Sequence, residues 1–79
     1  MSQTPRRLSD LAIGDSARIV RVEGDAGVRG RLLEMGLTAG ATVRLVRAAP
    51  LGDPLELLVR GYRLSVRRSE AAVVEIEAA

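Results

Sequence analysis

Residues 25 to 40 read Asp-Ala-Gly-Val-Arg-Gly-Arg-Leu-Leu-Glu-Met-Gly-Leu-Thr-Ala-Gly, and no other stretch of the chain predicts an α-helix as clearly. At about 100° per residue, the apolar side chains of Val28, Leu32 and Met35 fall on one arc. Asp25 suits the N-cap, because its carboxylate can accept a bond from a backbone N–H that lacks a helical partner, and Gly36 suits the left-handed residue that ends a helix. The stretch therefore predicts a short amphipathic helix with defined ends.

Two residues inside this helix need an explanation. A glycine in mid-helix costs about 1 kcal/mol relative to alanine, so Gly30 indicates either that another backbone passes close by or that the position is solvated and under little constraint. Arg29 falls within the apolar arc, and we expect a structural role in which its guanidinium reaches backbone carbonyls or a carboxylate. After the helix, residues 38–41 fit a type II turn with Gly40 at the position that requires positive φ.

Strand-like segments surround the helix. Residues 16–23, 41–48, 55–60, 63–67 and 74–77 show full or partial alternation of apolar and polar side chains. Gly61-Tyr62 is expected to form a two-residue hairpin turn, and residues 8–11 and 67–71 are expected to form helical turns, the second capped by Ser69. Five short strands leave exposed edges unless the sheet closes. We therefore predict a mainly β fold, a small SH3-like barrel of about five strands with one inserted helix, as a single domain over residues 1–79 with a loose arm at residues 1–6.

Composition excludes several classes of chemistry. The 79 residues include no cysteine and no histidine, and all twelve basic residues are arginine, with a net charge of +2. Disulfides, thiolate or imidazole metal sites and catalysis by histidine or cysteine are therefore excluded. The aspartates and glutamates show no recurrent ligand spacing, and no phosphate-binding Gly-Lys-Ser/Thr loop is present. We expect no enzymatic activity, no metal site and no cofactor.

Binding to a partner remains as the predicted role. The candidate residues lie in the predicted helix, in a proline-rich turn and around the hairpin, and are Arg29, Arg31, Met35, Leu51, Gly52, Asp53, Pro54, Arg60, Tyr62 and Arg63. Leu51, at the tip of the turn, either folds back onto the core or is offered to a partner. Met35 is expected to pack mainly in the core, whereas Tyr62 is a better contact candidate, because tyrosine and arginine are enriched in binding hot spots.

Three segments together resemble a known family. They are GVRGRLLEMGLTAG at residues 27–40, RAAPLGDPL at residues 47–55 and GYRLSVR at residues 61–67. In this order and spacing they resemble the FeoA family, ferrous iron transport protein A, over about residues 6–77. Ala39 differs from the proline that the family often carries. The resemblance implies a cytoplasmic SH3-like domain that assists FeoB, a ferrous iron transporter with a cytosolic GTPase domain, in a family usually catalogued under transition-metal or iron transport.

The leading hypothesis is a small cytoplasmic accessory protein of bacterial ferrous iron uptake. It would dock on the cytosolic side of a FeoB-like transporter, at the GTPase region or the membrane part, and modulate the GTPase or the gate. One alternative is an SH3-like regulatory domain related to those of metal-dependent repressors. Another is a nucleic-acid-binding barrel, which weak net charge and a single aromatic residue oppose, so no nucleic-acid partner is expected. No apolar run of 18 residues is present, so we expect no direct membrane insertion.

Overall fold

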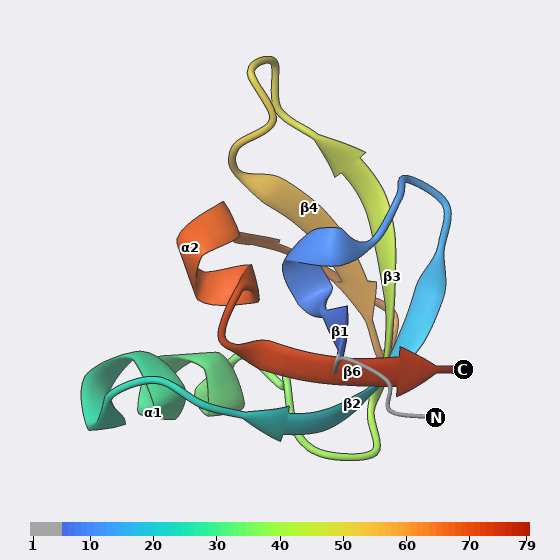
Figure 1. Cartoon of the computed structure of the whole chain (residues 1–79). Helices are drawn as coiled ribbons and strands as arrows, with labels where there is room; N and C mark the ends of the chain where they lie inside the picture. Colours follow the sequence, from blue (N-terminus) through green and yellow to red (C-terminus); the bar gives the residue numbers. More distant parts are fainter. Residues whose placement is uncertain (1–5) are drawn as a thin grey trace.

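The computed structural model describes residues 6–79. In chain order, its elements are β1 (Arg6–Arg7), the 3-10 helix η1 (Leu8–Asp10), β2 (Ser16–Val22), α1 (Ala26–Glu34), β3 (Thr42–Ala48), β4 (Leu55–Val59), β5 (Tyr62–Val66), α2 (Arg68–Ala71) and β6 (Val74–Ala78). The predicted mainly β fold with one inserted helix and two short helical turns is confirmed (Figure 1).

Six strands form one antiparallel sheet in the order β1-β6-β2-β3-β4-β5, which curves around the core (Figure 1). This is one strand more than predicted. The additional strand, β1, pairs Arg6 with Ile76 and Arg7 with Glu75. The predicted loose arm is therefore wrong at Arg6, and its first five residues lie outside the described residues. Two consecutive arginines show no alternation, so the sequence carried no signal for this strand.

The core is formed by the inward side chains of β2 to β6, closed by residues from the helical segments. Leu8 of η1, Leu32 of α1 and Leu37 after α1 are each 0% exposed. Aliphatic side chains make up nearly all of this interior, as the near absence of aromatic residues requires. Among the described residues, Glu70 is the one buried charged residue, at 8% exposure.

Helix α1 forms as predicted, with both ends set by the expected residues. Asp25 Oδ1 accepts from the Val28 N–H at 2.9 Å, and Gly36 takes φ = 99°. Arg29 Nε donates to the Val22 carbonyl at 3.2 Å, which confirms its structural role. A Cβ placed on Gly30 would meet nothing within 4 Å, so no other backbone of the described chain passes there and the solvated explanation holds.

The turns agree with the sequence less closely. Residues 38–41 form the expected turn, with the Ala41 N–H donating to the Thr38 carbonyl at 3.0 Å. The hairpin turn was placed one residue too late, because Val59 pairs with Tyr62 and the central residues are Arg60 and Gly61, at φ = 52° and 82°. Two positive φ values correspond to a type I′ turn, and arginine gives no signal for that conformation.

The predicted cap of α2 is also wrong. The helix begins at Arg68 with Arg67 as its N-cap residue, so Ser69 lies inside the helix. Glu70 Oε1 accepts from the Arg67 N–H at 2.8 Å, so the side-chain bond at this helix start comes from Glu70 and not from a serine cap. A glutamate at the third helical position can reach back to the N–H of the N-cap residue, and Glu70 does so here.

Candidate functional site

The candidate residues lie in two separate regions and on α1. Residues 51–54 belong to the loop between β3 and β4, whereas Arg60, Tyr62 and Arg63 lie at the opposite end of β4. Figure 1 shows the β3–β4 loop projecting from one end of the sheet. The structure therefore does not gather the candidates into one site, because the whole of β4 separates the two regions.

The β3–β4 loop, residues 49–54, contains a tight turn with leucine at its tip. The Gly52 N–H donates to the Ala49 carbonyl at 2.8 Å, so Pro50 and Leu51 are the central residues. Leu51 has φ = 77°, and its relative exposure is 106%. This is the third position of a type II turn, where positive φ favours glycine. Leu51 is thus held in an unfavourable backbone conformation, and its side chain is fully exposed to solvent.

Arg68 of α2 holds this loop in place. Its backbone N–H donates to Asp53 Oδ1 at 2.9 Å, and its Nε donates to the Gly52 carbonyl at 3.1 Å. The same guanidinium donates to the Ser9 carbonyl in η1 at 3.2 Å. The loop is therefore hydrogen-bonded to α2, whose Arg68 also contacts η1. These bonds hold residues 52 and 53, which lie next to the exposed Leu51.

A hollow of about 260 Å³ lies at the base of the loop, lined by Asp53, Pro54 and Arg67. The Asp53 carboxylate is already an acceptor for the first N–H of α2. Within residues 6–79 no group of three or more acidic side chains is placed to hold a metal ion. The hollow therefore adds polar surface beside the apolar tip.

The second region surrounds the β4–β5 hairpin. Tyr62 is 74% exposed at the start of β5, and Arg60 donates to Thr38 Oγ1 at 3.4 Å, so the hairpin lies beside the turn that follows α1. Arg63 contacts Glu56 across the strand pair at 3.4 Å. We call the exposed residues at this hairpin, Arg60, Tyr62 and Arg63, the hairpin patch, because tyrosine and arginine are residue types that protein partners often contact. Tyr62 and Arg63 are neighbours in β5 and point to opposite faces of the sheet, and Arg63 pairs with Leu58 on the outer face.

The α1 candidates are mainly engaged within the chain. Arg29 is bonded to the Val22 carbonyl, and Arg31 forms an ion pair with buried Glu70. Met35 is half-buried and packs against the core, as expected. Their side chains connect α1 to β2, α2 and the core.

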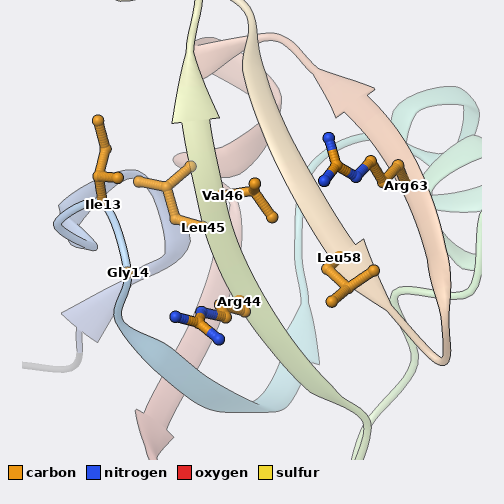
Figure 2. A pocket seen from close by; sticks show the side chains of 7 residues that line it. All are labelled: Ile13, Gly14, Arg44, Leu45, Val46, Leu58 and Arg63. Atoms are coloured by element: carbon orange, nitrogen blue, oxygen red, sulfur yellow. The ribbon is translucent and has the colours of Figure 1, made fainter.

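Sequence reasoning missed a third surface on the outer face of β3 and β4, which we call the outer groove. It is a hollow of about 330 Å³ lined by Ile13, Gly14, Arg44, Leu45, Val46, Leu58 and Arg63 (Figure 2). Arg44, Leu58 and Arg63 form one cross-strand row over β3, β4 and β5. The strand pairing creates this row, and the alternating pattern alone does not reveal which side chains face one another.

Comparison with known proteins shows consistent similarity. The family model described as FeoA domain matches residues 6–78. A curated Fe(2+) transport protein A/Fe(2+) transporter FeoB fusion protein from Porphyromonas gingivalis is 49% identical over 71 residues, which cover 90% of this chain and 8% of that protein. This chain thus corresponds to a small part of that relative's length. Within residues 6–79, no helix is long and apolar enough to cross a membrane.

Solved structures of FeoA proteins are similar to this chain in sequence and in fold. The FeoA protein from Chlorobium tepidum has 40% identity and a TM-score of 0.86, over 92% of this chain and 70% of that one. FeoA from Stenotrophomonas maltophilia, described as a procaryotic SH3 domain protein and complexed with zinc, has 33% identity and a TM-score of 0.80, over 91% and 89%. The predicted SH3-like fold is confirmed. A manganese-dependent transcriptional repressor superposes with a TM-score of 0.84 at 14% identity, over 98% of this chain and 44% of that one, which shows a shared fold alone.

Proposed function

The chain belongs to the FeoA family, and from this premise we propose that it is a cytoplasmic accessory protein of ferrous iron uptake that docks on a FeoB-type transporter. The fusion protein of Porphyromonas gingivalis supports this partner, because a FeoA part and a FeoB part occur there in one polypeptide. Two modules joined covalently meet at a high effective concentration, and a separate chain must reach the same contact through affinity. A FeoA domain that contacts the transporter therefore needs a docking surface.

The observation that carries the proposal is the conformation of Leu51. A leucine at φ = 77° costs about 1 to 2 kcal/mol, and this side chain is fully exposed, so the isolated chain recovers none of that cost through burial. Strain held at an exposed apolar residue favours a role in recognition. We propose that Leu51 inserts into an apolar pocket of the transporter, with Gly52, Asp53 and Pro54 around it.

The hairpin patch supplies a second contact in this proposal, through Arg60, Tyr62 and Arg63. Because the loop and the patch lie at opposite ends of β4, a partner that touches both must lie along the sheet or contact each with a different part. Such a two-ended contact is sensitive to rearrangement of the partner. Modulation of the GTPase or the gate then follows if the contacts are stronger in one conformation of the transporter than in the other.

The test measures calorimetric binding of the chain to the cytosolic GTPase region of its transporter and to the full-length transporter in detergent. GDP, a GTP analogue and ferrous iron alone are separate conditions. The informative variant is Leu51→Asn, because asparagine tolerates positive φ and removes the apolar tip. Leu51→Met is the matched control, because it keeps an apolar side chain at the same position.

We expect Leu51→Asn to weaken binding at least about tenfold, equivalent to about 1.4 kcal/mol, while Leu51→Met binds like the wild type. A folded Leu51→Asn chain that binds with unchanged affinity would exclude the loop as the docking element. No binding of the wild type to either form of the transporter would exclude the proposed function itself.

A further inference from the structure

The outer groove combines an apolar floor with basic edges. Val46 and Leu58 are half-buried on the floor, and Ile13 forms a rim at 65% exposure. Figure 2 shows the Arg44 side chain on β3 and the Arg63 side chain on β5, with Leu58 on β4 between those strands. The groove has a volume of about 330 Å³.

Most arginines of the sheet contact a glutamate, and Arg44 in the groove does not. Four strand arginines contact a glutamate on a neighbouring strand, in the pairs Arg18–Glu77, Arg21–Glu75, Arg47–Glu56 and Arg63–Glu56, at 3.1, 2.9, 3.4 and 3.4 Å. Arg44 has no carboxylate within ion-pair distance in residues 6–79, and its cross-strand neighbours are Ser16 and Leu58. The groove therefore has an arginine whose expected carboxylate is missing from the described chain.

Arg63 leaves the second edge of the groove only partly neutralised. It reaches Glu56 Oε1 at 3.4 Å, and Arg47 contacts the other oxygen of the same carboxylate at 3.4 Å. One glutamate thus serves two arginines, and both contacts are long for charge-assisted bonds. The groove keeps a net positive charge beside exposed apolar surface, which is complementary to an acidic segment with an apolar side chain.

We infer that the outer groove binds a linear segment of the transporter with the pattern acidic-x-apolar-x-acidic. In an extended segment these three side chains lie on one face and span about 13 Å, while the backbones of β3 and β5 lie about 10 Å apart. The apolar side chain rests on Val46 and Leu58, and the two carboxylates meet Arg44 and Arg63. The inference rests on the proposed function for the identity of the partner, whereas the groove itself specifies the chemistry.

The first test uses a peptide and does not require the transporter. The probe is acetyl-Glu-Ser-Leu-Ser-Glu-amide, titrated into the ¹⁵N-labelled chain and followed by NMR chemical shifts. One control peptide has lysine in place of both glutamates, and the other has serine in place of leucine. We expect saturable shifts in β3 and β4 with the probe and none with either control.

Variants then assign the contacts. Arg44→Gln and Ile13→Ser should each weaken binding of the probe peptide about fivefold. Arg21→Gln is the control, because Arg21 already contacts Glu75, and it should leave the affinity for the probe unchanged. Equal shifts with the lysine peptide, shifts confined to other elements, or no shifts up to about 5 mM probe would overturn the inference.

The second test uses the transporter and separates this inference from the docking proposal. If the wild type binds and Arg44→Gln weakens that binding about fivefold, the groove is part of the interface. If Leu51→Asn weakens binding and Arg44→Gln does not, the loop docks and the groove assignment is wrong. If the wild type does not bind, the proposed function fails and the transporter is excluded as the source of the segment, while the peptide titration still tests the chemistry of the groove.

Discussion

The contrast between Gly30 and Gly36 offers the sharpest test of the structure, because the same substitution should have opposite effects at two positions six residues apart. Gly30 lies in the middle of α1 with helical backbone geometry, and a Cβ there would meet nothing within 4 Å. Gly36 also has nothing within 4 Å of an added Cβ, but its φ is +99°. Neither alanine creates a clash, so backbone conformation alone determines the outcome.

Gly30→Ala should raise the free energy of unfolding by about 1 kcal/mol, the helix-interior difference between the two residues. Gly36→Ala should lower it by about 1 to 2 kcal/mol, because alanine is strained at positive φ. The gap between the two variants is then about 2 to 3 kcal/mol, a large share of the net stability of a chain this small. For a domain of this size, 1 kcal/mol corresponds to about 4 to 8 °C in Tm.

Urea denaturation followed by circular dichroism, together with thermal unfolding, measures both variants against the wild type. Unchanged m-values would show that the shift in midpoint reports stability. A Gly30→Ala chain that is less stable than the wild type would refute the reasoning, because it would show that α1 is closely approached at a point where the structure has open space. Equal effects of the two substitutions would refute the assigned backbone conformation at Gly36.

Three further predictions concern the loop and the buried carboxylate. Leu51→Asn should raise the free energy of unfolding by up to about 1 kcal/mol, because it relieves strain and loses no burial, and urea denaturation would contradict this if the variant were destabilised. Glu70→Gln should lower the free energy of unfolding by about 1 to 2 kcal/mol, because the Glu70 carboxylate is buried and accepts from the Arg67 N–H at 2.8 Å. The control Glu77→Gln, at an exposed position, should change the free energy of unfolding by less than about 0.5 kcal/mol. Comparable effects of the two substitutions in urea denaturation would contradict the burial of Glu70. Arg68→Ala should speed amide hydrogen exchange in residues 49–54 while Arg18→Ala, the outer-face control, leaves it unchanged; no difference between the two would show that Arg68 does not anchor the loop.

Local chemistry accounts for the features that sequence reasoning placed correctly. An Asp N-cap, glycines where φ is positive, and alternating aliphatic residues act over a few neighbouring positions, so α1, the turn at residues 38–41 and most strands follow from the chain itself. Strand β1, which sequence reasoning missed, depends on residues far apart in sequence, because it exists only where β6 pairs with it. The error at α2 was local, because Glu70 and not Ser69 supplies the side-chain bond at the start of that helix.

The candidate residues divide in the same way. Their chemical types were readable in the sequence, including an apolar tip on the β3–β4 loop and a tyrosine among arginines. Tertiary structure placed them at opposite ends of β4, engaged Arg29 and Arg31 in internal contacts, and left Leu51 fully exposed. It also aligned Arg44, Leu58 and Arg63 across three strands.

By itself, the sequence determined the fold class, the core composition and the absence of histidine and cysteine chemistry, because these depend on residue type and short-range pattern. The tertiary structure alone decided which arginines meet a carboxylate, since strand register brings together residues as distant as Arg18 and Glu77. The same pairing places Arg44 between Ser16 and Leu58, with no carboxylate opposite it, in the lining of the outer groove. Strand register thus decides which side chains face one another across the outer surface, and this depends on the pairing of several strands at once.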